Sequence, residues 1–416
     1  TYGKHIQRAM GLMASSTPEK RNTVRVLFYG QSITEQDWWK AVADDLRKRF
    51  PHANLVIENR AIGGHSSQLL VKTAEADLYP FYPDLVIFHV YGAHDKYEDI
   101  IRRLRERTTA DILHTTDHLG AKDTADEPTD GAKLTPQQWS PWFNAAFLPG
   151  VSKKYGTELA DVRGLWKQYL RDYDLKPPAI LKDGVHLNDR GCFVMAEAVK
   201  AYLRHDPKLG TGDDGRVKTY EVGKDVEWKD GKLALDFTGN RVDLIASEVA
   251  GPAAVRIDGK KPTAFPGVYA ATKTTGYAGT NWPILLRVGA EKPRVAEDWT
   301  LTVTEASADF KTVKFKVAGS VTGEDGDGDR SSRFVSKSGR VVIEPDDWNL
   351  DYGLKVFKKP LTAPFTVTWK VKAHAADEFA PPAGTKPGVE PAVTVAQGLP
   401  NGKHRLEVTG GPRSPV

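Results

Sequence analysis

The first half of the chain alternates between short apolar runs and longer stretches with helical periodicity. Apolar residues that recur every three or four positions predict an amphipathic helix, whereas a short continuous apolar run is typical of a strand buried on both faces. The short runs predict strands at residues 24–29, 55–57, 85–90, 110–116 and 158–162. The periodic stretches predict helices at residues 34–50, 66–78, 98–108 and 192–204. Strands that alternate with helices in this way predict a parallel sheet covered by helices on both faces.

The pattern changes after residues 206–216, a stretch rich in Gly, Pro and Asp that marks a domain boundary. Beyond it, apolar and polar residues alternate singly, which is typical of antiparallel strands with one solvated face. Asp258-Gly259 is a hairpin dipeptide within this half. We therefore predict an α/β domain at 1–210 and an antiparallel, jelly-roll-like β-sandwich at 217–416, either alone or with a large insertion.

Composition excludes several classes of protein. The 416 residues include 58 Lys and Arg against 54 Asp and Glu, and a net charge of +4 over so large a surface argues against a nucleic-acid binder. No apolar run approaches the roughly 18 residues of a membrane span, so we expect no integral membrane segment. Cys192 is the only cysteine, which excludes a disulfide framework and a thiolate metal cluster.

Chemistry-bearing residues occur where predicted strands end, which is where open α/β sheets bind ligands. Gly30-Gln31-Ser32 follows the first strand, Gly63-Gly64 follows the second, and His94 follows the third. Asp183 and His186 lie in a loop just before the last helix. Nucleophilic serine catalysis needs a base within hydrogen-bond reach, an acid that orients the base, and donors for the oxyanion. These blocks contain residues of every required kind.

With these four blocks in order, residues 24–204 resemble the SGNH superfamily, also called GDSL hydrolases. That family hydrolyses esters and related acyl groups on a flavodoxin-like, three-layer α/β/α fold. The resemblance implies that Ser32 is the nucleophile, His186 the general base and Asp183 its orienting acid. It also implies that Gly64 and the Ser32 N–H are oxyanion donors, and that no cofactor is required.

Two positions depart from the family pattern. Gln31 stands where the family usually has Asp, and His94 stands where it usually has the Asn that supplies the third oxyanion donor. A histidine N–H can donate the same hydrogen bond. It can also transfer a proton, which an asparagine cannot. His94 therefore either replaces the donor or indicates changed chemistry.

Further residues are candidates for contact with substrate, each with a structural alternative. His65 adjoins the candidate oxyanion glycine, and a solvent-facing or structural role is its alternative. For Trp38 and Trp39 we expect one ring in the core and the other at the pocket. The set of additional substrate-binding candidates is Gln31, Asp95, His65, His118, Trp38 and Trp39.

The polar loop at residues 119–138 is long for a compact domain, and such loops are usually functional or mobile. Trp139 and Trp142 follow it, where exposed aromatic rings could stack on sugars; core packing is the alternative. In the second half, Asp325, Asp327 and Asp329 alternate like the start of a calcium loop. The EF-hand pattern fails at its sixth and twelfth positions, so we favour a solvated hairpin tip.

An SGNH-like domain followed by a β-sandwich resembles bacterial carbohydrate esterases. We therefore predict a hydrolase that removes acyl groups, most simply acetyl, from a carbohydrate or polysaccharide, with no nucleic-acid partner. The chain begins at Thr1, and we expect a secreted or periplasmic protein from which a leader was removed. One alternative is cleavage of a glycosidic bond, as a glycosidase or lyase, by His94, Asp183 and His186. Another is an inactive glycan-binding protein.

Overall fold

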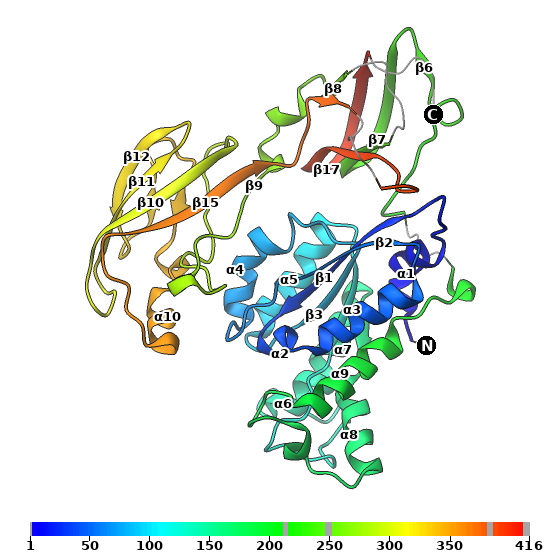
Figure 1. Cartoon of the computed structure of the whole chain (residues 1–416), viewed down its shortest axis with the longest axis vertical. Coiled ribbons are helices and arrows are strands. Elements are labelled where there is room, and N and C mark those ends of the chain that lie inside the picture. The colour runs from blue at the N-terminus through cyan, green and yellow to red at the C-terminus, as the bar shows by residue number, and fades with distance from the viewer. Residues whose placement is uncertain (1, 211–214, 246–251, 381–385, 411–416) are drawn as a thin grey trace. The chain divides into compact units, whose positions relative to one another are not determined.

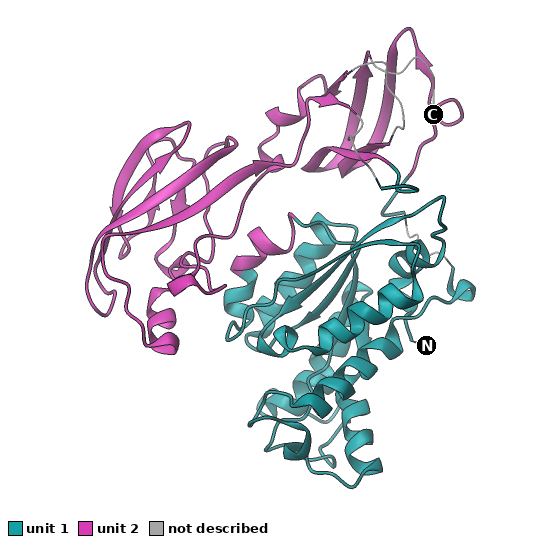
Figure 2. Cartoon of the chain, in the orientation of Figure 1, with its two compact units in different colours: residues 1–71, 81–218, 386–390 teal, residues 72–80, 219–385, 391–416 magenta. Residues whose placement is uncertain are grey.

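The computed structural model describes residues 2–210, 215–245, 252–380 and 386–410. The chain forms two compact units, coloured in Figure 2. Unit 1 comprises residues 1–71, 81–218 and 386–390, and unit 2 comprises residues 72–80, 219–385 and 391–416. Neither unit is therefore a single continuous stretch of the chain.

The centre of unit 1 is a parallel sheet whose strands follow the order β2-β1-β3-β4-β5. This order is that of flavodoxin-like doubly wound folds, in which ligands bind at the carboxyl ends of the strands. The prediction of a parallel α/β sheet is confirmed. The strands are β1 (Thr23–Gly30), β2 (Asn54–Asn59), β3 (Leu85–His89), β4 (Asp111–Thr115) and β5 (Glu158–Ala160).

Helices cover both faces of this sheet, which gives three layers (Figure 1). One face packs on α1, α3, α8 and α9 through a core that includes Val26, Phe28, Ile87 and Trp166. On the other face, the stacked rings of Tyr29 and Phe88 lead to Tyr97 of α5. The helices are α1 (Gln7–Ala14), α2 (Ser32–Glu35), α3 (Trp38–Arg49), α4 (Ser67–Asp77), α5 (His94–Arg107), α6 (Trp139–Trp142), α7 (Leu148–Tyr155), α8 (Val162–Asp172) and α9 (Asp189–Tyr202).

Several helical segments differ from the sequence prediction, and α1, α6 and α7 were not predicted at all. The helix expected at 34–50 is two helices, because Gln36 adopts an extended conformation with φ −68° and ψ 151° between α2 and α3. The helix expected at 98–108 begins earlier, at His94. Helix α8 was not predicted, although its apolar residues Val162, Leu165, Trp166, Tyr169 and Leu170 recur at helical spacing.

Unit 2 contains two larger antiparallel sheets in the described residues, so the predicted antiparallel architecture is confirmed. Their strand orders are β12-β11-β10-β15-β9 and β16-β8-β17-β7-β6. The strands are β6 (Trp228–Lys229), β7 (Lys232–Ile245), β8 (Ala253–Ile257), β9 (Tyr269–Ala271), β10 (Glu297–Ala306), β11 (Val313–Gly319), β12 (Gly323–Asp329), β15 (Phe365–Ala373), β16 (Glu378–Phe379) and β17 (Ala392–Thr409). A short pair, β13 (Phe334–Val335) and β14 (Val342–Ile343), and helix α10 (Leu350–Phe357) complete the unit.

Each larger sheet of unit 2 has its own apolar contacts. Trp299 of β10 and Trp369 of β15 are direct cross-strand partners, and their rings stack at 6.1 Å. The sheet around β17 has a core cluster that includes Val255, Ile257 and Leu406. Single alternation of apolar and polar residues in these strands follows from burial of one face only.

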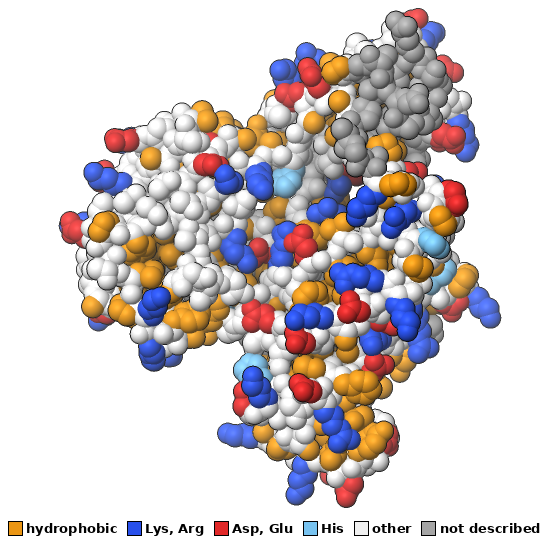
Figure 3. Space-filling view, viewed as in Figure 1, with side chains coloured by type: hydrophobic (Ala, Val, Ile, Leu, Met, Phe, Trp, Pro, Cys, Tyr) orange, Lys and Arg blue, Asp and Glu red, His pale blue; other side chains and the backbone are white. Residues whose placement is uncertain are grey.

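The surface carries charges of both signs. Figure 3 shows Lys and Arg side chains interspersed with Asp and Glu over the face in view, rather than gathered by sign. Among the described residues, no helix has both the length and the apolar character that crossing a bilayer requires.

Candidate active site

Ser32 lies at the end of β1, where the chain leaves the sheet and enters α2. Glycine is required at the last position of the strand: a Cβ on Gly30 would lie 2.3 Å from the His89 carbonyl oxygen and 2.4 Å from Thr34 Oγ1. The close packing of Gly30 thus places Ser32 as the first residue of α2. Its Oγ lies 3.0 Å from His186 Nε2, although 154 residues separate the two in sequence.

Asp183 fixes the orientation of His186. The Oδ2 atom of Asp183 lies 2.9 Å from His186 Nδ1, while its Oδ1 atom accepts the backbone N–H groups of Val185 and His186 at 2.8 Å each. These backbone N–H groups, that of His186 first, and the His186 ring hold the pKa of Asp183 well below its usual range. Because the ionised carboxylate accepts a hydrogen bond from Nδ1–H, the lone pair of Nε2 faces Ser32.

Two hydrogen bonds from the segment after β4 hold the Asp183–His186 turn. His118 Nε2 donates to the Val185 carbonyl at 2.7 Å, and the Ala121 N–H donates to the Gly184 carbonyl at 3.0 Å. Burial lowers the pKa of His118 to about 4, so the ring is neutral at neutral pH. His118 was predicted to contact substrate; with 2% of its surface exposed, it instead supports the turn from within.

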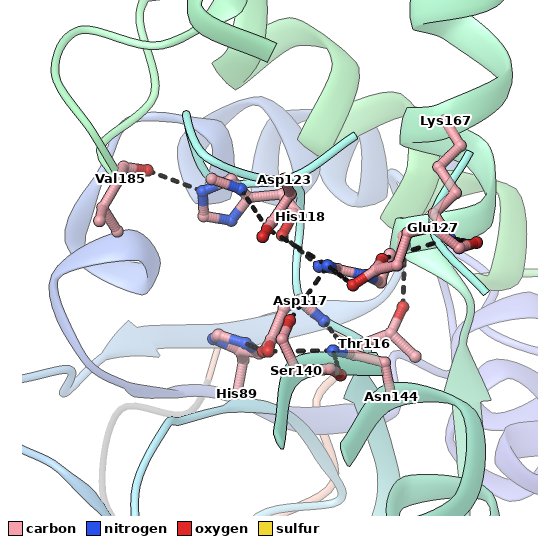
Figure 4. Close-up of polar contacts among 12 residues, drawn as sticks. His89, Thr116, Asp117, His118, Asp123, Glu127, Ser140, Asn144, Lys167 and Val185 are labelled. Atoms are coloured by element: carbon pink, nitrogen blue, oxygen red, sulfur yellow. Dashed lines mark hydrogen bonds and ion pairs between the residues drawn. The ribbon is translucent and has the colours of Figure 1, made fainter. Parts of the chain in front are cut away.

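The same segment is anchored by a buried cluster of polar side chains (Figure 4). Arg163 of α8 donates to both carboxylate oxygens of Glu127 at 2.7 and 2.8 Å, to Asp123 at 3.2 Å and to Ser140 at 3.0 Å. It also donates to the carbonyl of His118 at 2.8 Å. The polar loop at 119–138 is therefore fastened to α8 and, through His118, to the Asp183–His186 turn.

A second histidine–aspartate pair lies beside this cluster. His89 Nε2 and Asp117 Oδ1 are 2.5 Å apart, and both side chains are buried. Asn144 accepts the Asp117 N–H at 2.7 Å and donates to its Oδ2 at 3.2 Å. His89 lies within the apolar run of β3, and its Nε2 has Asp117 as a partner. Its Nδ1 is buried and has no hydrogen-bond partner within the described residues.

The glycine turn after β2 lies directly beside Ser32. A Cβ on Gly63 would lie 3.6 Å from Ser32 Cβ and 2.5 Å from a carboxylate oxygen of Glu35. Gly64 has φ +72°, a left-handed conformation that favours glycine. The structure thus brings the predicted oxyanion turn to the nucleophile. His65 is fully buried and contacts the Gly63 carbonyl at 3.3 Å, so its role here is structural.

His94 begins α5 inside a group of aromatic side chains. The centroid of its ring lies 4.8 Å from the rings of Trp142 and Phe147, 5.5 Å from Phe143 and 6.0 Å from Trp139. Burial lowers the pKa of His94, against an opposing effect of Asp95, so the neutral ring is favoured. Its Nε2 is buried and makes no hydrogen bond within the described residues. A group bound at this nitrogen would satisfy it.

The remaining candidates take ordinary structural positions. Gln31 is 7% exposed and extended, and its carbonyl begins the first turn of α2. Trp38 is buried with its Nε1 on the Ile33 carbonyl, and both Trp38 and Trp39 pack on Phe28. The Asp95 carboxylate is exposed and lies 3.0 Å from the Lys96 ammonium.

The candidate calcium residues in unit 2 have separate partners. Asp325 is buried and accepts the N–H and Oγ–H of Ser338, at 2.8 and 2.6 Å, while Asp329 accepts the Ser331 N–H at 2.7 Å. Nowhere in the described ranges do three His, Cys, Asp or Glu side chains form a group suited to a metal ion. Asp325, Asp327 and Asp329 thus do not converge on a common centre.

Sequence analysis missed the residues that hold the turn in place. Gln36 bonds to the backbone of Leu187, and Arg163, Glu127 and Asn144 build the buried cluster. A signal existed for Gln36, a polar residue four positions after Ser32 inside a predicted helix. Its partner is a backbone group far away in the sequence, which no local pattern reveals.

No protein-family model and no curated protein sequence matches this chain. Several solved structures resemble part of it, among them the following three. LAE5, an alpha/beta hydrolase enzyme from the metagenome of Lake Arreo in Spain, is 17% identical over 45% of this chain and 98% of its own, with a TM-score of 0.36. Axe2, an acetylxylan esterase from Geobacillus stearothermophilus, is 16% identical over 45% and 97%, with a TM-score of 0.37. A GDSL-like lipase from Parabacteroides merdae is 18% identical over 44% and 98%, with a TM-score of 0.36.

Similarities of this size do not indicate a shared substrate. Independently of them, unit 1 combines the doubly wound strand order with a serine after β1 and an Asp-x-x-His turn before the last helix of its α/β region. Unit 1 has a doubly wound, three-layer α/β/α fold that is similar to the fold of SGNH hydrolases.

Proposed function

We propose that this protein is a serine hydrolase that cleaves acyl esters. The observation that carries the proposal is the continuous hydrogen-bond chain from Asp183 through His186 to Ser32. An orienting carboxylate, a base with its lone pair on the serine, and a serine at a helix start are the parts that nucleophilic acyl transfer requires. A purely structural serine needs neither the imidazole nor the carboxylate behind it.

In the proposed reaction, His186 Nε2 takes the Ser32 hydroxyl proton while Oγ bonds to the carbonyl carbon of the ester. The carbonyl electron pair moves to oxygen and forms the tetrahedral oxyanion. When that pair returns, the bond to the alcohol oxygen breaks, and His186 gives its proton to the departing alcohol. A water molecule then repeats the sequence on the acyl-enzyme, which releases the acid and restores Ser32.

Three groups are suited to stabilise the oxyanion. The Ser32 N–H lies at the start of α2 and makes no hydrogen bond within the described residues. The turn at Gly63 and Gly64 adjoins Ser32. A neutral His94 can supply a third N–H, because a neutral imidazole donates from one nitrogen. Each such donor typically contributes a factor of about 10²–10³ in turnover.

We infer that the ester is carried by a carbohydrate. Trp139 is 37% exposed and stacks on Phe143 at 4.9 Å with nearly parallel planes. It belongs to the aromatic group around His94, so a ring bound against Trp139 would lie near that residue. Flat, exposed aromatic rings suit the apolar faces of sugars. We propose acetyl, a small acyl group, as the group that this reaction removes.

Labelling with a small serine-directed fluorophosphonate tests the nucleophile. We expect one adduct on the intact protein by mass spectrometry, and none on Ser32→Ala. Against acetylated oligosaccharides, we expect release of acetate without shortening of the chain, and a loss of at least about 10⁴ in kcat for Ser32→Ala. Failure to label the folded wild-type protein, or unchanged turnover in the alanine variant, would contradict the proposal.

Cleavage of a glycosidic bond would give different products. That alternative needs a second acid or base near the bond, and Asp95 is exposed and paired with Lys96. Shortened oligosaccharides without acetate would nevertheless identify it. Glycan binding without any product would identify an inactive binding protein.

A further inference from the structure

Ser32 and His186 come from distant segments, and a second side chain joins these segments close to the first. Gln36 follows α2 and leaves the helical conformation, so its amide reaches the chain beside His186. Its Nε2 donates to the Leu187 carbonyl at 2.8 Å, and its Oε1 accepts the Leu187 N–H at 2.9 Å. One amide thus binds both backbone groups of the residue that follows His186.

This paired contact restrains the two segments more tightly than a single hydrogen bond would. Two parallel hydrogen bonds fix the separation of the segments and also their relative rotation. The path from Ser32 to His186 through Gln36 crosses only the single turn of α2 and one peptide. His118 and Ala121 hold the opposite side of the Asp183–His186 turn, and neither belongs to the segment that carries Ser32.

We propose that Gln36 is a positioning residue that sets the geometry between Ser32 Oγ and His186 Nε2. The inference rests on the proposed function, because it matters only if Ser32 is an activated nucleophile. Gln36 itself touches neither reacting atom. It acts by keeping the imidazole in line with the hydroxyl, where a displacement of about 1 Å costs on the order of 10²-fold in rate.

The substitution Gln36→Glu makes the contact with Leu187 depend on pH. A neutral carboxylic acid has one donor and one acceptor, so it can replace both hydrogen bonds of the amide. An ionised carboxylate can still accept from the Leu187 N–H, but it repels the Leu187 carbonyl. The nearest ionisable groups are Glu35 and Asp37 on its own segment and His186 and Asp183 on the turn. Gln36→Met fills similar space and makes neither bond.

The experiment measures the second-order rate constant for fluorophosphonate labelling of Ser32 from pH 5 to pH 9. At pH 8 we expect Gln36→Glu and Gln36→Met to label at least about tenfold more slowly than wild type. As pH falls, the labelling rate constant of Gln36→Glu, divided by that of wild type, should rise. The same ratio for Gln36→Met should not change with pH. Taking ratios removes any dependence on pH that the variants share with wild type.

Gln7→Glu is the matched control. Gln7 is a buried amide of unit 1 that also holds backbone groups, donating to the carbonyls of Gly3 and Arg204 and accepting the Asp206 N–H. We expect this variant to lower the midpoint of thermal unfolding but to label at the wild-type rate. A labelling rate that is lowered in a pH-dependent way in Gln36→Glu, but unchanged in Gln7→Glu, separates the role of Gln36 from general destabilisation.

The outcomes distinguish the two proposals. If wild type labels at Ser32 and both Gln36 variants label equally fast, the positioning role is wrong and the serine hydrolase stands. The positioning role is also wrong if the labelling rate constant of Gln36→Glu, relative to wild type, does not change with pH. It is wrong too if Gln7→Glu gives the same relative rate constants. If folded wild type does not label, the proposed function is wrong and the positioning role falls with it.

Discussion

At the scale of single residues, His94 has the least ordinary surroundings. Most buried polar nitrogens in proteins have a hydrogen-bond partner, yet His94 Nε2 has none in the described part of the chain. The aromatic rings around it disfavour the charged imidazole, as the lowered pKa of His94 reflects. A neutral ring with one unsatisfied nitrogen is suited to bind an oxygen that becomes negatively charged during the reaction.

Replacing His94 by phenylalanine tests this role. Phenylalanine preserves the packing against Trp142 and Phe147 but removes the N–H, so we expect kcat for ester hydrolysis to fall by about 10²–10³. His94→Asn, which restores a donor, should recover part of that loss. The measurement is steady-state hydrolysis of an acetate ester, with the thermal unfolding midpoint as a check of folding. Wild-type kcat in the phenylalanine variant would exclude His94 as a donor.

The residues with their own chemistry could be predicted from sequence, and those that support them could not. Ser32, Asp183 and His186 each follow a recognisable element and carry a reactive group, and the structure brings them together. Gln36 binds only a backbone carbonyl and N–H, which every residue has. His118 was predicted as a substrate-binding candidate. Its burial and its hydrogen bond to the Val185 carbonyl could not be predicted, because they depend on a contact between segments far apart in the sequence.

At the scale of elements, the loop at 119–138 is joined to α8 by charged hydrogen bonds. Length and polarity alone suggested function or mobility, whereas Arg163 and its carboxylate partners fasten the loop to α8. Arg163 and Lys167 lie on the buried side of α8, yet the helix keeps a regular apolar stripe. Its helical periodicity was therefore readable from the sequence, whereas the partners of Arg163 on the loop were not.

Glu127→Gln should destabilise unit 1 by about 3 kcal/mol, because it leaves the buried guanidinium of Arg163 without its main counter-charge. Asp130→Asn is a control on the same loop, since the exposed pair of Asp130 and Lys133 should contribute less than about 1 kcal/mol. Urea unfolding monitored by tryptophan fluorescence gives both values. Equal, small effects of the two substitutions would mean that the cluster does not stabilise the loop.

At the scale of the whole molecule, the change of periodicity near residues 206–216 predicted the parallel and antiparallel halves correctly. The domain limits of 1–210 and 217–416 stay a prediction. The compact units differ from these limits at two short segments. Residues 72–80 belong to unit 2, and residues 386–390 belong to unit 1. Neither assignment could be predicted from the local sequence, because each depends on contacts with segments that are far away in the sequence.

Acid should destabilise unit 1 through its buried histidines. Burial lowers the pKa of His114 to about 3 and that of His118 to about 4, so the unfolded chain, with histidine pKa values near 6.5, binds more protons. Their contribution is complete above about pH 6.5 and is lost as pH falls toward 4. The expected slope is up to about 1.4 kcal/mol per pH unit for each histidine.

Measuring the free energy of unfolding between pH 8 and pH 4.5 checks this expectation. His114→Gln keeps a polar side chain beside Tyr97 and Thr157 and removes one titrating group, so its stability should fall less steeply with acid. An identical slope in wild type and variant would show that His114 does not titrate on unfolding.

Because residues 386–390 belong to unit 1, they affect how the protein can be divided into fragments. The Arg21 N–H donates to the Gly388 carbonyl at 2.7 Å, and Arg21 also pairs with Val389, so a late piece of the chain completes an early one. A single cut, by a protease or in the gene, cannot release either unit with all of its own residues. A version of unit 1 that keeps all of its residues would have to carry this distant peptide beside Arg21, joined by a new connection.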